Sequence, residues 1–282
     1  MILKSFFTFL FSSLILLFVS CSTDKENNNK LSELTTNTGT VEETPKRKFP
    51  NALENGKFIT VNNKRMMYGG GDSTWHFDVS NLTLKEENFH FGIGREKFHA
   101  LINPKYISME EAEKDTAITD SSRFLYVNIN GDARAYSVNL LTHHEIVNDV
   151  VGGEPIMAAY CVLADLGAIY TRKLGGKVFT FALSGYTYYD ENVWDGLDGF
   201  VFWDRETEST WWPLIGKAVS GPMLETNLIE YNKENWADIT WTEIKAKNIP
   251  NLKVLKSGQT MEPPPTWKKF TEKEIKEIKA NL

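Results

Sequence analysis

Alternating apolar and polar positions predict that β-sheet dominates the folded part of the chain. Residues 124–129 and 133–138 both alternate in this way, and Asn130-Gly131 lies between them. Asn-Gly is the residue pair that a two-residue type I′ turn prefers, because both positions take positive φ angles. These residues are therefore predicted to form a tight antiparallel hairpin.

The same pattern predicts three further hairpins, each made of two apolar-rich segments around a polar or glycine-containing turn. Their strands are residues 58–61 with 65–68, residues 168–173 with 178–183, and residues 200–203 with 210–212. Successive hairpins favour one twisted sheet or a partly closed barrel. The predicted fold class is α+β, a predominantly antiparallel β meander with a few short helices.

Short helices are predicted where a capping residue precedes apolar residues at helical spacing. Ser108 precedes an acidic first turn, and Thr240 is followed three residues later by Glu243, which is the pattern of a capping box. Residues 95–101 and 271–280 are predicted as two more short helices.

Residues 1–20 have the pattern of a secretory signal peptide, with Lys4 followed by an apolar run that is short for a membrane span. The end of this stretch and the residue after it, Phe18-Val19-Ser20-Cys21, resemble the lipobox of bacterial lipoproteins. In that class the chain is cut before the cysteine, which then carries acyl chains that anchor it to the membrane. A plain signal peptide with a chance cysteine is the alternative.

The domain organisation follows from this signal. Residues 21–50 are predicted as an acylated Cys21 followed by a flexible tether, since they are rich in Asn, Thr, Glu, Lys and Ser. Residues 51–282 are predicted as a single globular domain. The expected location is the bacterial cell envelope, in a membrane-anchored lipoprotein of the outer membrane that faces the periplasm or the surface.

Charge and cysteine content narrow the function. The formal net charge of −6 provides no basic face, so nucleic acid is excluded as an expected partner. Cys21 and Cys161 are the two cysteines. If Cys21 is acylated, the mature chain has one thiol and no internal disulfide. A thiol in an oxidising compartment is expected to be either buried or functional.

The richest stretch for chemistry runs from residue 143 to residue 161. Apolar spacing predicts a short helix between residues 138 and 149, which places His144 and Asn148 on one helix face at positions i and i+4. A strand over residues 155–161 then follows, so Cys161 is expected near His144.

Several separate motifs resemble a bacterial family catalogued as domain of unknown function 3179, over about residues 95–255. They are His144–Asp149, Gly152-Gly153, Tyr160-Cys161, Ser184-Gly185, and Asp204–Ser209 with Trp211. The resemblance implies a secreted or lipid-anchored envelope protein and no particular reaction. Family members commonly read Tyr-Cys-Pro-Leu-Cys-Gly, whereas Val162 and Ala164 replace the proline and the second cysteine here. This departure excludes dithiol chemistry.

One interpretation of the site is a cysteine-dependent hydrolase or transferase. Cys161 is then the nucleophile and His144 is the general base that lowers its pKa. Glu145 or Asp149 orients the imidazole, and Ser184 or nearby backbone N–H groups supply an oxyanion site.

A second interpretation is a metal site, because thiolate and imidazole ligands suit copper or zinc. Cys161 and His144 are the candidate ligands, with Glu145, Asp149 or a distant histidine to complete the set.

The third interpretation is structural or binding. His144, Asn148 and Asp149 then satisfy backbone groups at the turn from helix to strand, and Cys161 is a small buried core residue. The domain is then a binding module for a small molecule, a metal or an envelope partner. Asn148, Ser184 and Arg205 are its candidate ligand-binding residues, and exposed sheet positions are a candidate aromatic platform, formed by Trp194, Trp203, Trp211 and Trp212. The sequence favours the binding module, with the Cys161/His144 enzyme as the alternative.

Overall fold

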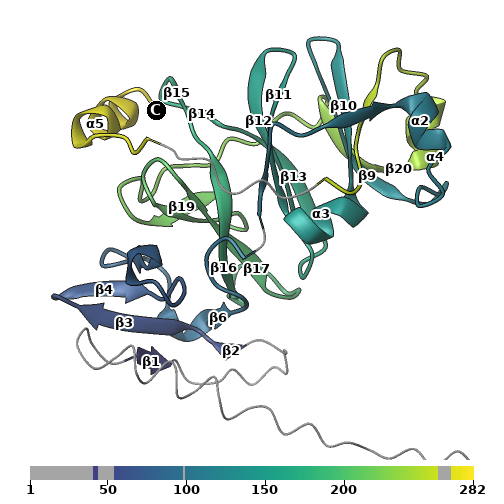
Figure 1. Ribbon diagram of the computed structural model, residues 1–282. Coiled ribbons are helices and arrows are strands. Elements are labelled where there is room, and N and C mark those ends of the chain that lie inside the picture. Colours follow the sequence, from purple (N-terminus) through teal and green to yellow (C-terminus); the bar gives the residue numbers. More distant parts are fainter. Residues whose placement is uncertain (1–40, 44–53, 98, 260–267) are drawn as a thin grey trace, which may run out of the picture. The chain divides into compact units, whose positions relative to one another are not determined.

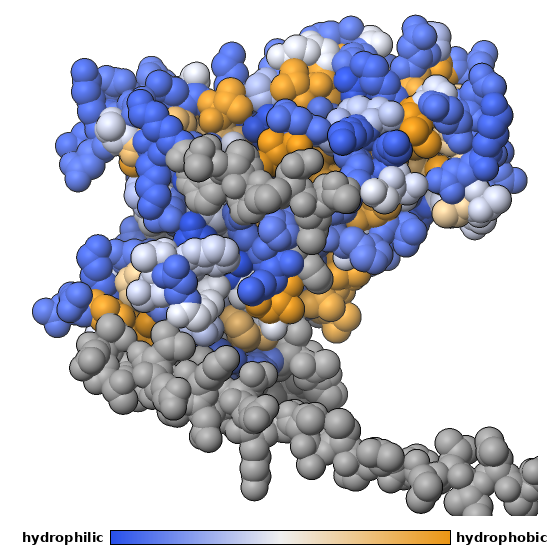
Figure 2. All heavy atoms as spheres, in the orientation of Figure 1, coloured by the Kyte–Doolittle hydropathy of each residue, from blue (hydrophilic) through white to orange (hydrophobic). Residues whose placement is uncertain are grey.

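The fold is seen in a computed structural model that describes residues 41–43, 54–97, 99–259 and 268–282 (Figure 1). All of these residues belong to one unit, Thr38–Leu282. The predicted signal peptide and Cys21 lie outside the described residues. Within the described part, no helix is long and apolar enough to cross a membrane. On the face seen in Figure 2, hydrophilic side chains predominate between smaller hydrophobic patches.

The predicted hairpin over residues 58–68 is confirmed within a four-stranded sheet. Asn62 and Asn63 occupy the turn with φ angles of 50° and 62°. In order across the sheet, the strands are β1 (Val41–Glu43), β3 (Lys57–Val61), β4 (Lys64–Met67) and β5 (Phe77–Asp78). The first of these strands lies inside the segment predicted as a tether.

The Asn-Gly hairpin is also confirmed, in a five-stranded sheet. Asn130 and Gly131 have φ angles of 50° and 80°, as a type I′ turn requires. The strands are, in order, β20 (Trp236–Thr240), β9 (Arg123–Ile129), β10 (Asp132–Ser137), β21 (Lys253–Leu255) and β8 (Tyr106–Ser108).

A second four-stranded sheet carries the central stretch. Its strands are, in order, β13 (Leu166–Thr171), β12 (Glu154–Cys161), β11 (Ile146–Val151) and β7 (Leu101–Ile102). The helix predicted over residues 138–149 is too long, because the helix α3 (Val138–His144) ends where Glu145 takes a φ of 53°. The β-branched residues after it favour a strand. His144 and Asn148 therefore do not share a helix face.

A six-stranded sheet contains the confirmed hairpin of residues 200–212. Its strands are, in order, β19 (Lys217–Ser220), β18 (Thr210–Trp212), β17 (Gly199–Asp204), β16 (Phe181–Tyr188), β6 (Phe89–Phe91) and β2 (Glu54–Asn55).

The predicted hairpin of residues 168–173 with 178–183 is wrong beyond its turn. Only β14 (Lys173–Leu174) and β15 (Lys177–Val178) pair with each other. β13 pairs with β12, whereas β16 pairs with β17 and β6. The chain therefore passes from one sheet to another at this point.

The predicted helix caps are confirmed. Ser108, Thr240 and Thr271 each form a capping box at the start of a helix. Besides α3, the described residues form the α-helices α2 (Met109–Glu113), α4 (Trp241–Ala246) and α5 (Glu272–Ala280) and the short 3-10 helices η1 (Ser73–Trp75) and η2 (Glu86–Asn88). The helix predicted over residues 95–101 is wrong: Glu96 takes a φ of 51° in a turn, and β7 begins at Leu101.

Aromatic side chains fill the largest hydrophobic core. Trp203, Trp211 and Trp212 are each at most 1% exposed, so these three tryptophans pack inside the protein and form no surface platform. Tyr188 and Phe181, for example, pack edge-on against Trp212 and Trp211 at centroid distances of 4.7 and 5.7 Å. The predicted α+β class with mainly antiparallel strands is confirmed. Among the described residues, the strands form several separate sheets, and no sheet closes on itself.

Candidate functional site

Cys161 ends β12 and is buried, with 3% of its surface exposed. The backbone N–H of Phe200 donates to its Sγ at 3.3 Å, and the thiol lies 3.7 Å from the carbonyl oxygen of Asp198. Burial, together with the nearby Glu145 carboxylate and against backbone hydrogen bonds from the neighbouring turn, raises the pKa of the Cys161 thiol to about 11. The thiol is therefore protonated at neutral pH.

Glu145 is the predicted site residue that the structure brings to Cys161. Its backbone carbonyl accepts from Tyr160 N at 2.8 Å, which ties the end of α3 to the residue before the thiol. Burial raises the pKa of Glu145 to about 7, although a hydrogen bond from the Val162 backbone acts in the opposite direction. The Glu145 carboxyl and the Cys161 thiol thus lie beside each other, and both have a raised pKa.

His144 is held by another partner. Its Nδ1 lies 2.9 Å from the backbone carbonyl oxygen of His99, just before β7. Among the described residues, no hydrogen bond joins His144 to Cys161. The proposed roles of His144 as a base or a metal ligand stay predictions.

Asp149 lies far from the thiol. It pairs with Ile156, five residues before Cys161 on β12, which corresponds to about 16 Å along a strand. Its carboxylate accepts from Tyr136 Oη at 2.6 Å and from Tyr106 Oη, and Arg134 Nε lies 3.8 Å away. These contacts place Asp149 in a separate polar cluster.

Asn148 and Ser184 bond to backbone groups inside the protein. Asn148 joins two sheets through hydrogen bonds to Phe181 on β16. Ser184 Oγ donates to Val201 O and accepts from Tyr186 N at 3.1 Å, across the bulge in the β16–β17 pairing. Both side chains therefore hold the sheets in place.

Arg205 is 1% exposed and forms a bidentate ion pair with Glu96. The Nε–Oε1 distance is 2.8 Å and the Nη2–Oε2 distance is 3.1 Å. This geometry matches a guanidinium to a carboxylate and joins the turn after β17 to the segment before β7. The structure thus gives the Arg205 side chain a strong partner within the protein.

Metal ligands do not gather in the part of the chain that the structure describes. No group there of three or more His, Cys, Asp or Glu residues could hold a metal ion. Cys161 and His144, the predicted copper or zinc ligands, have no third ligand of these types among the described residues.

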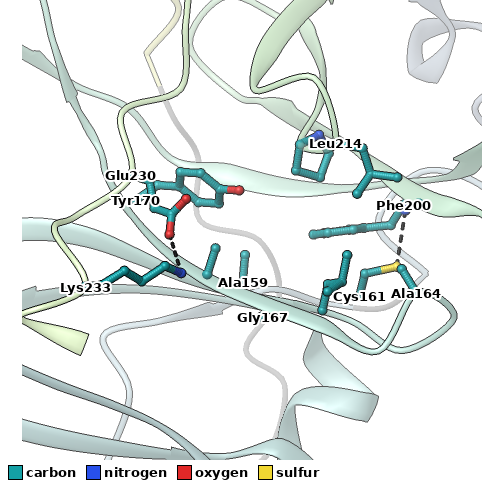
Figure 3. A pocket seen from close by; sticks show the side chains of 13 residues that line it. Ala159, Cys161, Ala164, Gly167, Tyr170, Phe200, Leu214, Glu230 and Lys233 are labelled. Atoms are coloured by element: carbon teal, nitrogen blue, oxygen red, sulfur yellow. Dashed lines mark hydrogen bonds and ion pairs between the residues drawn. The ribbon is translucent and has the colours of Figure 1, made fainter. Parts of the chain in front are cut away.

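A cavity of about 200 Å³ lies beside Cys161 (Figure 3). Cys161 and Phe200 form one end, while Tyr170 lies at the other end with Glu230 and Lys233, whose charged groups are 2.6 Å apart. Small residues leave the space open between these ends. The complete lining is Ala159, Cys161, Ala164, Leu166, Gly167, Ala168, Tyr170, Gly199, Phe200, Pro213, Leu214, Glu230 and Lys233.

The sequence analysis missed this cavity. Its walls come from β12, β13 and β17, which belong to two different sheets, and from three connecting segments. Tyr170, Phe200 and Lys233 form no motif, since their spacing in sequence reflects no local structure. Only the signal at Cys161 pointed to this region.

A buried pair that also escaped prediction supports the cavity wall. His90 Nδ1 lies 2.6 Å from Asp198 Oδ2, and Thr187 Oγ1 donates to the same oxygen at 2.8 Å. The Asp198 backbone in turn contacts the Cys161 thiol. The pair thus anchors the segment that carries Phe200.

Together these features define a β-rich α+β protein with a small cavity, lined mostly by apolar residues, next to a buried thiol. Residues 95–281 match the family described as protein of unknown function (DUF3179), so the chain belongs to this family. The matched region begins where the resemblance predicted and extends past residue 255 through α5. No curated protein matches the chain, and no solved structure matches it.

Proposed function

We propose that this protein is a lipid-anchored module of the bacterial cell envelope that binds a small, mainly apolar molecule in the cavity beside Cys161. The observation that carries the proposal is the cavity itself, which is lined mostly by apolar residues and has charged residues at one end. Binding sites for small molecules have this composition. The anchoring part rests on the signal sequence and on Cys21.

The volume of the cavity indicates the size of the ligand portion that fits inside it. An apolar cavity of about 150 Å³ is large enough to hold benzene, whereas sites for drug-sized molecules measure about 300–1,000 Å³. The present cavity of about 200 Å³ therefore suits a molecule with one ring or an equivalent short chain.

The state of Cys161 favours binding over the alternative, a cysteine-dependent hydrolase or transferase. A pKa of about 11 leaves about one thiol in 10⁴ ionised at pH 7. The Glu145 carboxylate beside the thiol contributes to this raised pKa, and the His144 imidazole bonds to a backbone carbonyl. A buried, protonated Cys161 acts as a small apolar wall residue.

Filling the cavity tests the proposal. Ala164 lines it and is nearly buried, so Ala164→Leu adds three carbon atoms to the space that a ligand needs. Ala246→Leu, at an exposed position at the end of α4, makes the same change away from the cavity. We expect toluene to bind the wild-type protein and Ala246→Leu, with loss of binding in a folded Ala164→Leu variant, as measured by ligand-observed NMR. Equal binding to all three proteins would contradict the proposal.

A further inference from the structure

The geometry points to an uncharged ligand of single-ring size with one hydrogen-bonding oxygen, which bonds to the Tyr170 hydroxyl. This inference rests on the proposed binding function and specifies the chemistry of the ligand. Phenols and small aromatic alcohols are examples of this class that fit the cavity volume of about 200 Å³.

Tyr170 is the residue that carries the inference. It is 8% exposed and lies on β13, and its hydroxyl points into the cavity in Figure 3. No described residue hydrogen-bonds this hydroxyl. A hydroxyl that faces the cavity and has no hydrogen-bond partner among the described residues is open to water or to a ligand. A ligand oxygen in the cavity can take the place of that water.

The Tyr170 hydroxyl can serve as either donor or acceptor for such an oxygen. Burial raises the pKa of Tyr170, and the Glu230 carboxylate nearby adds to the rise, so the phenol stays neutral at physiological pH. A neutral phenol both donates and accepts. A hydroxyl on the ligand therefore satisfies the geometry as well as a carbonyl does.

The charges around the cavity favour an uncharged ligand. Glu230 and Lys233 are the charged residues in the lining, and they neutralise each other at 2.6 Å. Lys233 Nζ also lies 3.4 Å from the centre of the Trp236 ring. A carboxylate or ammonium group on the ligand that enters the apolar part, away from this pair, would be unpaired there, which is unfavourable.

Two probes that differ by one hydroxyl test the inference: toluene and p-cresol. Their dissociation constants are measured with the wild-type protein and with Tyr170→Phe, which keeps the ring and removes only the hydroxyl. Since that hydroxyl has no hydrogen-bond partner among the described residues, Tyr170→Phe is expected to keep the wild-type melting temperature. The difference in hydrophobicity between the probes cancels when the two proteins are compared.

We expect the preference for p-cresol over toluene to fall about twofold to tenfold in Tyr170→Phe, which is the range for one net hydrogen bond. An unchanged preference would overturn the inference. Tighter binding of benzoate or benzylamine than of p-cresol would overturn the uncharged class. In both cases the proposed function survives if Ala164→Leu still blocks toluene. If the wild-type protein binds none of these probes, both proposals fail.

Discussion

The side chain of Asn148 pairs with the backbone of Phe181 in the way that a neighbouring strand would. Asn148 Oδ1 accepts from Phe181 N at 2.9 Å, and Nδ2 donates to Phe181 O at 2.8 Å. Asn148 is 2% exposed and belongs to β11, whereas Phe181 begins β16 in a different sheet. One amide therefore supplies both hydrogen bonds of a ladder position between two sheets.

Replacing this amide should destabilise the fold. We expect Asn148→Ala to lower the free energy of unfolding by about 3 kcal/mol, because it leaves a buried N–H and a buried C=O of Phe181 without partners. Urea denaturation followed by tryptophan fluorescence measures the loss. Asn139→Ala, at an exposed position of α3, is the matched control and should change stability by less than about 0.5 kcal/mol. A similar loss in both variants would contradict this role.

Glu145 should make stability depend on pH in the direction opposite to an ordinary carboxylate. Its pKa rises from 4.5 in the unfolded chain to about 7 in the folded protein. Its favourable contribution is therefore fully present below about pH 4.5 and is lost as the pH rises through about 7. Glu145→Gln, which resembles the protonated form, should be more stable than the wild-type protein by about 2 kcal/mol at pH 8, and by much less at pH 5.

Urea unfolding at pH 5 and pH 8 measures this difference. Glu234→Gln removes one negative charge at an exposed position, so its effect at each pH is subtracted as the general effect of charge removal. Other buried carboxyls such as Asp204, whose pKa is also raised to about 7 by burial, are present in both proteins and cancel in the comparison. A Glu145→Gln effect that is equal at both pH values would show that Glu145 is ionised throughout.

Local chemistry made part of the fold predictable. The Asn130-Gly131 turn and the Thr240 capping box depend on residues within four positions of each other, so the sequence alone indicates them. The pairing of residues 168–173 with 178–183 looked equally local. It was wrong because β12 and β17 are better partners for these strands, and the competition between distant strands is not visible in a local pattern.

In the candidate site, too, local structure brings some residues together, whereas others meet only through the packing of distant strands. Glu145 and Cys161 lie close because they sit at one end of the β11–β12 hairpin, which is a short-range feature. Tyr170, Phe200 and Lys233 meet only when separate sheets pack together, so no spacing in the sequence predicts their cavity. Arg205 belongs to a family motif, and its burial against Glu96 shows that such a residue can stabilise the fold itself.

Acylation of Cys21 has a direct test in metabolic labelling with palmitate. We expect the wild-type protein to be labelled and to sediment with membranes, and Cys21→Ser to lose both properties. Cys161→Ser is the matched control, because Cys161 is buried and lies outside the lipobox. Unchanged labelling of Cys21→Ser would remove the anchor from the proposed function.

Slow alkylation is expected of Cys161 in the folded protein. Since iodoacetamide reacts with the thiolate and the pKa of Cys161 is about 11, the rate should rise about tenfold per pH unit from pH 7 to pH 10.

Glu145→Gln should speed the reaction at pH 9, because it removes a neighbouring negative charge that raises the pKa of the thiol. Mass spectrometry of the modified chain measures these rates, and the urea-unfolded protein provides the reference for a free thiol. Rapid alkylation of the folded protein at pH 7 that disappears in His144→Ala would instead support the cysteine-dependent enzyme.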